Sequence, residues 1–98
     1  MAMLHIIRNS AFNNNSLSQC LAMCMAQDTI LLMDDGCYNL QHPLLLDMPT
    51  KHSEINVHFV QLHATARAQH TEQGLFTAVS MEDVLQLIFS HDNAITWS

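Results

Sequence analysis

Positive charge is scarce in this chain of 98 residues, which has three Lys and Arg residues against nine Asp and Glu residues and a formal net charge of −6. Proteins that bind nucleic acids neutralise phosphates with clustered basic side chains. The basic residues Arg8, Lys51 and Arg67 are widely separated in the sequence and form no such cluster along it. We therefore expect no direct binding of nucleic acid by this chain.

Long apolar runs are also missing, and none approaches the ~20 residues that a membrane-spanning helix needs. His5 and Arg8 interrupt the apolar residues near the start of the chain, so we do not expect a signal-peptide core there. The three cysteines are odd in number and have no secretory context, which favours reduced thiols. These absences predict a cytoplasmic protein that does not enter a membrane.

Sequence motifs for common cofactors are absent as well. The chain contains neither G-x-G-x-x-G nor G-x-x-x-x-G-K-[ST], so we expect no dinucleotide site and no phosphate-binding loop. Its seven histidines show neither H-E-x-x-H nor H-x-x-E-H spacing, and no Cys-x-x-Cys pair occurs. The sequence patterns therefore predict no cofactor and no metal site.

The chain does have a hydrophobic content of ordinary size together with few charges. Hydrophobic residues make up 49% of the sequence and charged residues 12%, whereas charged residues make up about 25% of an average domain. Interface cores between proteins are depleted in charge. We therefore expect part of the surface to contact another protein and the isolated chain to self-associate. A sparsely charged monomer is the alternative.

Strand and helix signals alternate along the chain and predict a single domain over residues 1–98. The expected strands are residues 4–7, 29–33, 55–62, 75–79 and 94–97. The expected helices begin after Ser16, at Pro43, at His63 and after Ser80, with Pro49 and Gly74 ending the second and third. This order predicts an α/β fold with an open, mainly parallel sheet of about five strands and helices on both faces.

The last helix has the clearest local signals. Ser80 and Asp83 stand at the two positions of a capping box, which satisfies unpaired backbone N–H groups at a helix start. Three apolar residues at helical spacing form its expected buried stripe, with Leu85 at the margin. The three residues are Val84, Leu87 and Ile88.

Loops that leave the carboxyl ends of parallel strands form the sites of open sheets. Here they bring Asn13, Asp35 and His63 together as a candidate pocket. Asp34 and Asp35 are poor candidates for a shared catalytic site, because neighbouring residues that leave a strand point in different directions. We expect Gly36 to supply a positive φ in a tight turn after them.

Two cysteines lie four residues apart in the first helix. Cys24 falls on the expected apolar face with Leu17, Leu21 and Met25, so we expect it to be a small core residue. Cys20 flanks that face and is expected to be half-exposed. It is the weak candidate for a persulfide-carrying thiol, and a structural role is the alternative.

The ordered combination of these segments resembles the DsrH/TusB family of sulfur-relay proteins over nearly the whole chain. In the first half, the resemblance rests on Met3-Leu4-His5, Ser10, Phe12, Asn15-Ser16-Leu17, Cys20-Leu21, Asp35-Gly36 and Tyr38. In the second half, it rests on residues 57–67, His91 and Trp97. The chain departs from the family at His63, where an acidic residue is frequent, and at Arg67-Ala68, where Arg-Gly is frequent.

The resemblance implies a DsrE/F/H-like fold and two related partner subunits, of the TusC/DsrF and TusD/DsrE types, in a dimer of heterotrimers. In the Tus system, persulfide sulfur passes towards 2-thiouridine at the tRNA wobble position, and the established acceptor cysteine belongs to the D-type subunit. Cys20 matches the cysteine position of the DsrH branch.

Our leading hypothesis is therefore a non-catalytic, TusB-like subunit of a cytoplasmic sulfur-relay complex. One alternative is an active persulfide carrier through Cys20. Another is a DsrEFH-type subunit in sulfur oxidation.

Overall fold

The computed structural model describes residues 2–12, 15–51, 53–69 and 76–97. They form a five-stranded sheet in the order β4-β3-β2-β1-β5, in which every pairing is parallel. The strands are β1 (Met3–Ile7), β2 (Thr29–Leu32), β3 (Asn56–Val60), β4 (Thr77–Val79) and β5 (Asn93–Trp97). The predicted parallel sheet of about five strands is confirmed.

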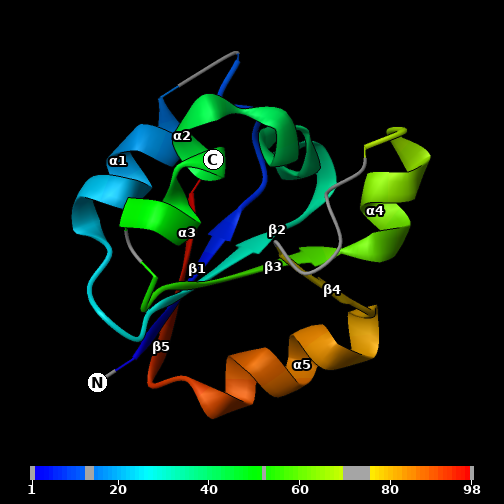
Figure 1. Ribbon diagram of the computed structural model, residues 1–98. Helices are drawn as coiled ribbons and strands as arrows, with labels where there is room; N and C mark the ends of the chain where they lie inside the picture. The colour runs from blue at the N-terminus through cyan, green and yellow to red at the C-terminus, as the bar shows by residue number, and fades with distance from the viewer. Residues whose placement is uncertain (1, 13–14, 52, 70–75, 98) are drawn as a thin grey trace.

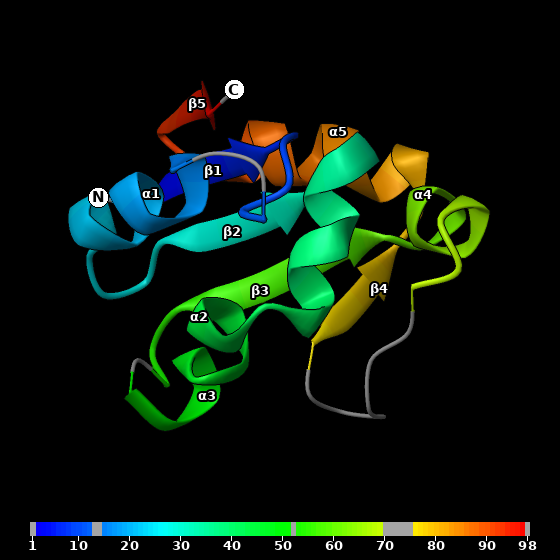
Figure 2. The same ribbon diagram turned by 90° about the horizontal axis from the view of Figure 1, so that it is seen from above.

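Helices lie on both faces of this sheet, as predicted, with α5 along one face and α1, α2 and α3 along the other (Figure 1). Their bounds are α1 (Ser16–Met23), the 3-10 helix η1 (Asp34–Gln41), α2 (Pro43–Leu46), α3 (Met48–Lys51), α4 (Gln61–Ala66) and α5 (Met81–Ser90). The view from above shows η1 and α4 beside one another at the end of the sheet opposite to the start of β1 (Figure 2). None of the helices in the described ranges is long and apolar enough to cross a membrane.

The central strand β2 is buried at all four residues, as expected for a strand covered on both faces. Its side chains alternate between two cores. Ile30 and Leu32 pack in the larger core, under α1, η1, α2 and α4. Leu31 packs in the smaller core, where Val84 of α5 joins it. The two faces of the sheet are therefore covered unequally.

The capping box at the start of α5 is confirmed. The Ser80 side chain accepts a hydrogen bond from the Asp83 N–H at 3.2 Å, and the Asp83 carboxylate accepts one from the Ser80 N–H at 3.1 Å. The buried stripe is narrower than predicted. Val84 is buried and Leu87 half-buried, but Ile88 is exposed because the edge of the smaller core ends beneath it.

Other boundaries differ from the prediction where local signals were weak. Pro43 does start α2, but Pro49 does not end it, since α2 stops at Leu46 and Pro49 lies inside α3. The strand predicted over 55–62 ends at Val60, and α4 begins at once and ends at Ala66. Gly74 and Leu75 lie outside the described residues.

The first helix is shorter than its apolar pattern predicts. It ends at Met23, and the backbone of Cys24 is already extended, with ψ 141°. Met25 is consequently 72% exposed instead of buried. The burial of the two cysteines is the reverse of the expectation, because Cys20 is fully buried against the sheet and Cys24 is only half-buried.

Candidate functional site

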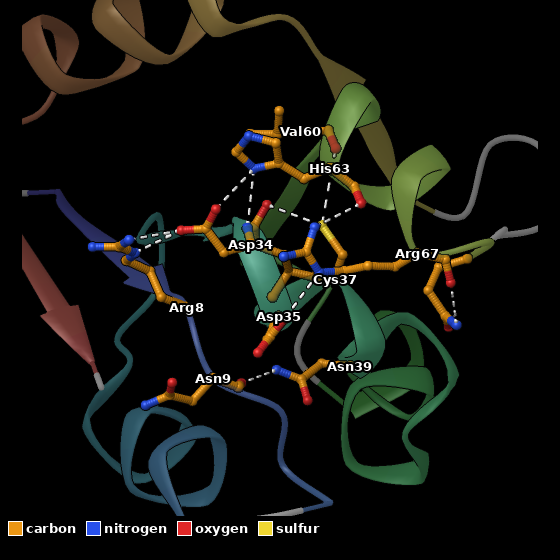
Figure 3. A network of polar contacts seen from close by, with 11 residues as sticks. Arg8, Asn9, Asp34, Asp35, Cys37, Asn39, Val60, His63 and Arg67 are labelled. Carbon is orange, nitrogen blue, oxygen red and sulfur yellow. Dashed lines mark hydrogen bonds and ion pairs between the residues drawn. The ribbon is translucent and has the colours of Figure 1, made fainter.

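A cluster of charged side chains lies where β1, β2 and β3 end, and we call it the carboxyl-edge cluster (Figure 3). Its members come from the loop after β1, from the start of η1, from α4 and from the residue that follows α4. Four of them, with Asn9, line a cavity of about 320 Å³. The cluster consists of Arg8, Asp34, Asp35, His63 and Arg67.

The two carboxylates of the cluster have separate partners. Nε of Arg8 donates to Asp34 at 2.8 Å, and Nε of Arg67 donates to Asp35 at 2.9 Å. The bond to Asp35 raises the pKa of Arg67 above its ordinary value. The prediction that Asp34 and Asp35 point in different directions therefore agrees with this geometry. The pairs fix the four charges and leave no free carboxylate pair for acid–base chemistry.

The third connection of the cluster runs from η1 to α4. The backbone N–H of Asp34 donates to Nδ1 of His63 at 3.0 Å. Because Nδ1 is an acceptor here, the proton of a neutral His63 ring sits on Nε2. Asp35 and His63, two of the three residues of the predicted pocket, thus come to the same edge of the sheet. Asn13 lies outside the described residues.

The turn after β2 differs from the expectation in one respect. The left-handed residue is Asp34, with φ 49°, and not Gly36. Asp tolerates this conformation better than most residues because of its short polar side chain. Gly36 is required for another reason, since a Cβ at this position would lie 2.0 Å from the carbonyl oxygen of Ile7.

The buried residues beneath the cluster hold it in place. Cys37 is fully buried, and its Sγ lies 3.7 Å from the Leu32 carbonyl and 3.9 Å from that of Val60. Burial raises the pKa of this thiol to about 11. Cys37 is therefore protonated near neutral pH and unsuited to nucleophilic chemistry.

Asn39 is a supporting residue that the sequence patterns did not reveal. It is fully buried, its Oδ1 accepts from the Ala11 N–H at 2.7 Å, and its Nδ2 donates to the Asn9 carbonyl at 3.1 Å. These bonds tie η1 to the loop after β1. An isolated Asn in a weakly patterned segment carries no sequence signal for such a role.

A second polar group lies inside the larger core, between α1 and the start of β2, and we call it the thiol cluster. It consists of His5, Cys20, Cys24 and Asp28. Nε2 of His5 lies 3.0 Å from Oδ2 of Asp28, and Nδ1 of His5 accepts from Nε1 of Trp97 at 3.1 Å. The indole proton fixes the neutral ring as the tautomer that donates from Nε2 to Asp28.

Asp28 is the polar centre of this second group. Its carboxylate also accepts the backbone N–H groups of Met3 and Met25, each at 3.0 Å. Burial raises the pKa of Asp28, but the hydrogen bonds from His5, Met25 and Met3 outweigh it, so the pKa lies below its ordinary value. Asp28 is therefore a carboxylate at neutral pH, although it is buried.

The two thiols of the cluster lie in contact, with 3.8 Å between their Sγ atoms. The hydrogen bond between them, burial and the charge of Asp28 all raise the pKa of Cys20. The same hydrogen bond lowers the pKa of Cys24. Cys24 therefore loses its proton first, whereas Cys20, which was expected to be half-exposed and was only a weak persulfide candidate, is buried and stays protonated.

The sequence of this chain matches the family model described as "DsrH like protein" over residues 9–94. The chain belongs to the DsrH-like family. His5 and Trp97, near the two ends of the chain, are among the residues on which the family resemblance rested. Their rings stack in the structure, with centroids 6.2 Å apart. A search of curated protein sequences finds no significant match.

Two solved structures resemble the DsrH-like chain in fold. The ychN protein from E. coli is 14% identical, with a TM-score of 0.68 over 99% of this chain and 100% of that one. Protein Tm0979 from Thermotoga maritima is 14% identical, with a TM-score of 0.63 over 92% of this chain and 93% of that one. At this level of identity the likeness shows the α/β fold alone.

Proposed function

We propose that this DsrH-like chain is a non-catalytic subunit of a cytoplasmic sulfur-relay complex of the TusBCD type. In such a complex, persulfide sulfur passes towards 2-thiouridine at the tRNA wobble position. Family membership supports the sulfur-relay role. The observation that carries the subunit role is a group of exposed apolar side chains along α5 and at the start of α4.

This surface, which we call the α5 face, consists of Leu62, Met81, Leu85, Ile88 and Phe89. All five side chains are exposed, with Leu62 at 70% and Phe89 at 84%. Positions 81, 85, 88 and 89 recur at helical spacing along one side of α5. Leu62 and Met81 line one groove of about 760 Å³ between α4 and α5, which joins the two parts of the surface.

Exposed apolar patches of this kind mark interaction sites in folded proteins. Burial of a large apolar side chain contributes about 1.5–3 kcal/mol, so a partner that covers several of the five gains substantial free energy. Phe89 is the best anchor, since aromatic residues are enriched among the residues that dominate binding. We infer that the TusC-like and TusD-like subunits dock through this face.

The described residues also support the non-catalytic part of the proposal. The charges of the carboxyl-edge cluster are paired with one another, and the Cys37 thiol beneath them is buried and protonated. Cys20, the alternative persulfide carrier, is fully buried with a raised pKa. A thiol in that state is a poor acceptor for the sulfur of a large donor protein.

The test is co-expression of the chain with TusC-like and TusD-like subunits, followed by affinity purification through the D-type subunit. We expect the three chains to co-purify, and Phe89→Lys to lower the recovery of this chain at least ~10-fold, since a hot-spot loss exceeds ~1.4 kcal/mol. Met23→Lys is the matched control, because Met23 is also exposed, apolar and in the last turn of a helix.

Failure of the wild-type chain to co-purify would contradict the subunit role, and equal loss in both variants would contradict the α5 face. The pathway is tested separately by deleting the gene and measuring 2-thiouridine in total tRNA by mass spectrometry. We expect the modified nucleoside to disappear. Its persistence would leave the subunit role but refute tRNA thiolation as its purpose.

A further inference from the structure

Three metal-binding side chains, one His and two Cys, converge in the thiol cluster from two distant parts of the sequence. His5 lies in β1, Cys20 in α1 and Cys24 directly after α1. One potential ligand atom from each residue lies within 4.8 Å of the other two. His5 and Cys20 are buried, and Cys24 is half-buried, so the three side chains are held by packing before any ion arrives.

The spacing of the sulfurs suits a tetrahedral ion. Zinc binds thiolates at about 2.3 Å, and at the tetrahedral angle this places two sulfurs about 3.8 Å apart. The Sγ atoms of Cys20 and Cys24 are 3.8 Å apart. An ion can therefore bind both thiolates with little movement of α1. Two Cys and one His are also the protein ligands of known zinc sites that keep a fourth position open.

The surroundings of His5 supply the outer contacts of such a site. A metal-bound histidine almost always donates its other ring N–H to a carboxylate or a carbonyl. His5 has Asp28 on Nε2 and Trp97 on Nδ1. Asp28 serves as the outer carboxylate when Nδ1 binds the ion and gives up its hydrogen bond from the Trp97 indole, because the Nε2–H then still donates to Asp28. Backbone N–H groups of Met3 and Met25 keep Asp28 in place meanwhile.

Charge favours a divalent ion over a monovalent one. Two thiolates neutralise Zn²⁺, whereas Cu⁺ with the same ligands leaves a net negative charge beside the carboxylate of Asp28 in a largely buried position. Burial of an uncompensated charge is costly. A route for entry exists, since an apolar cavity of about 530 Å³ reaches His5 and Asp28 and is bordered by Met23, Met25 and Trp97.

We propose that His5, Cys20 and Cys24 form a zinc-binding site, with Asp28 as the outer carboxylate. Binding releases the two thiol protons to solvent and involves no change of oxidation state. The site is independent of the proposed relay role, because a chain that binds no zinc could still join the complex through the α5 face.

The experiment is titration of the reduced, metal-free full chain with Co²⁺, an optical substitute for Zn²⁺, followed by displacement with Zn²⁺ against a chelator of known affinity. We expect a thiolate-to-cobalt charge-transfer band that saturates at one equivalent and disappears on addition of zinc. Native mass spectrometry should show one zinc ion per chain.

Cys24→Ser is the decisive variant, because Cys24 is half-buried and the substitution is nearly isosteric. We expect the charge-transfer band to weaken and zinc affinity to fall more than ~100-fold, beyond the loss that outer contacts cause. Cys37→Ser is the matched control and should bind like the wild type. Circular dichroism establishes that both variants are folded.

Three results would overturn the site. They are the absence of a thiolate band at one equivalent of Co²⁺ in the wild-type chain, an unchanged band in folded Cys24→Ser, and a band that depends on Cys37. The last two would mean that the ion binds through a different set of thiolates.

Discussion

The carboxyl-edge cluster and the thiol cluster place comparable numbers of polar groups in opposite physical settings. At the carboxyl edge, Arg8 and Asp34 form an ion pair whose side chains remain 55% and 34% exposed. In the thiol cluster, the His5 and Asp28 side chains are only 2% and 5% exposed. Water can replace a lost partner in the first setting but not in the second, so similar hydrogen bonds should have very different effects on stability.

The largest effect is expected beneath the carboxyl-edge cluster, at Gly36. In Gly36→Ala the new Cβ meets the backbone oxygen of Ile7 at 2.0 Å, so β1 or η1 has to shift. We expect the free energy of unfolding to fall by about 3 kcal/mol, the upper range for overpacking. Urea unfolding followed by circular dichroism measures it.

Ala68→Gly is the control for the Gly36 substitution. Ala68 has φ 53°, where glycine is tolerated without a steric penalty. We expect the free energy of unfolding of Ala68→Gly to stay within ~1 kcal/mol of the wild-type value. Glycine relieves the left-handed backbone strain at position 68, which stabilises the fold, but it also makes the unfolded chain more flexible, which destabilises the fold. A Gly36→Ala protein as stable as Ala68→Gly would show that η1 is free to move away from β1.

The comparison of the two clusters is tested directly by neutralising one carboxylate in each. In Asp28→Asn, an NH2 group replaces one of the two oxygens that accept the three N–H donors, and this NH2 group faces a donor instead of an acceptor. We therefore expect the free energy of unfolding to fall by about 2–3 kcal/mol. Asp34→Asn breaks an exposed ion pair and should cost less than ~1 kcal/mol. Chemical denaturation of both variants at neutral pH measures the difference.

Equal losses in Asp28→Asn and Asp34→Asn would contradict the distinction between the clusters. Removal of Arg8 gives an internal check, because Arg8→Gln and Asp34→Asn break the same pair. Their effects should be similar and should shrink as salt is added, since exposed ion pairs are screened. The effect of Asp28→Asn should be nearly insensitive to salt.

The smallest effect is expected from His58, a half-buried histidine outside both clusters. Nδ1 of His58 is buried with no hydrogen-bond partner among the described residues. Burial lowers the pKa of His58, and the nearby His91 lowers it further. In the unfolded chain His58 has a pKa of about 6.5, so below this pH it binds a proton more readily in the unfolded chain than in the folded one.

His58 should therefore make the fold less stable as the pH falls below about 6.5. The loss continues down to the lowered pKa of the folded state and is absent at higher pH. Urea unfolding at several pH values between about 8 and about 5 measures this slope, because this interval brackets the ordinary pKa of histidine. The slope should be reduced in His58→Gln, and an unchanged slope would assign the pH dependence to other groups.

Much of the fold could be predicted because its signals are local or depend only on hydrophobicity. The capping box of Ser80 and Asp83 acts within four residues, so its sequence pattern is sufficient. The apolar run of β2 predicts a strand covered on both faces, and this strand is central in the sheet. Boundaries around Pro49 and Leu62 were wrong, because a hydrophobic pattern identifies an element better than it marks the residue where the element ends.

The candidate sites were predicted less completely. The carboxyl ends of parallel strands gather at one edge, which is why Asp35 and His63 could be expected there. Arg8 and Arg67 were missed as partners because ion pairs between distant segments depend on side-chain direction. The burial of Cys20 and Cys24 was reversed because α1 ends earlier than its apolar residues suggest.

By itself, the sequence determined the α/β class, the parallel order of elements and the DsrH-like family, since hydrophobic periodicity and short ordered motifs are properties of the chain. Only the tertiary structure decided which cysteine is buried, why Gly36 is glycine, and that His5 meets two thiols. These facts depend on distances between segments far apart in the chain, and the distances exist only once the sheet has formed.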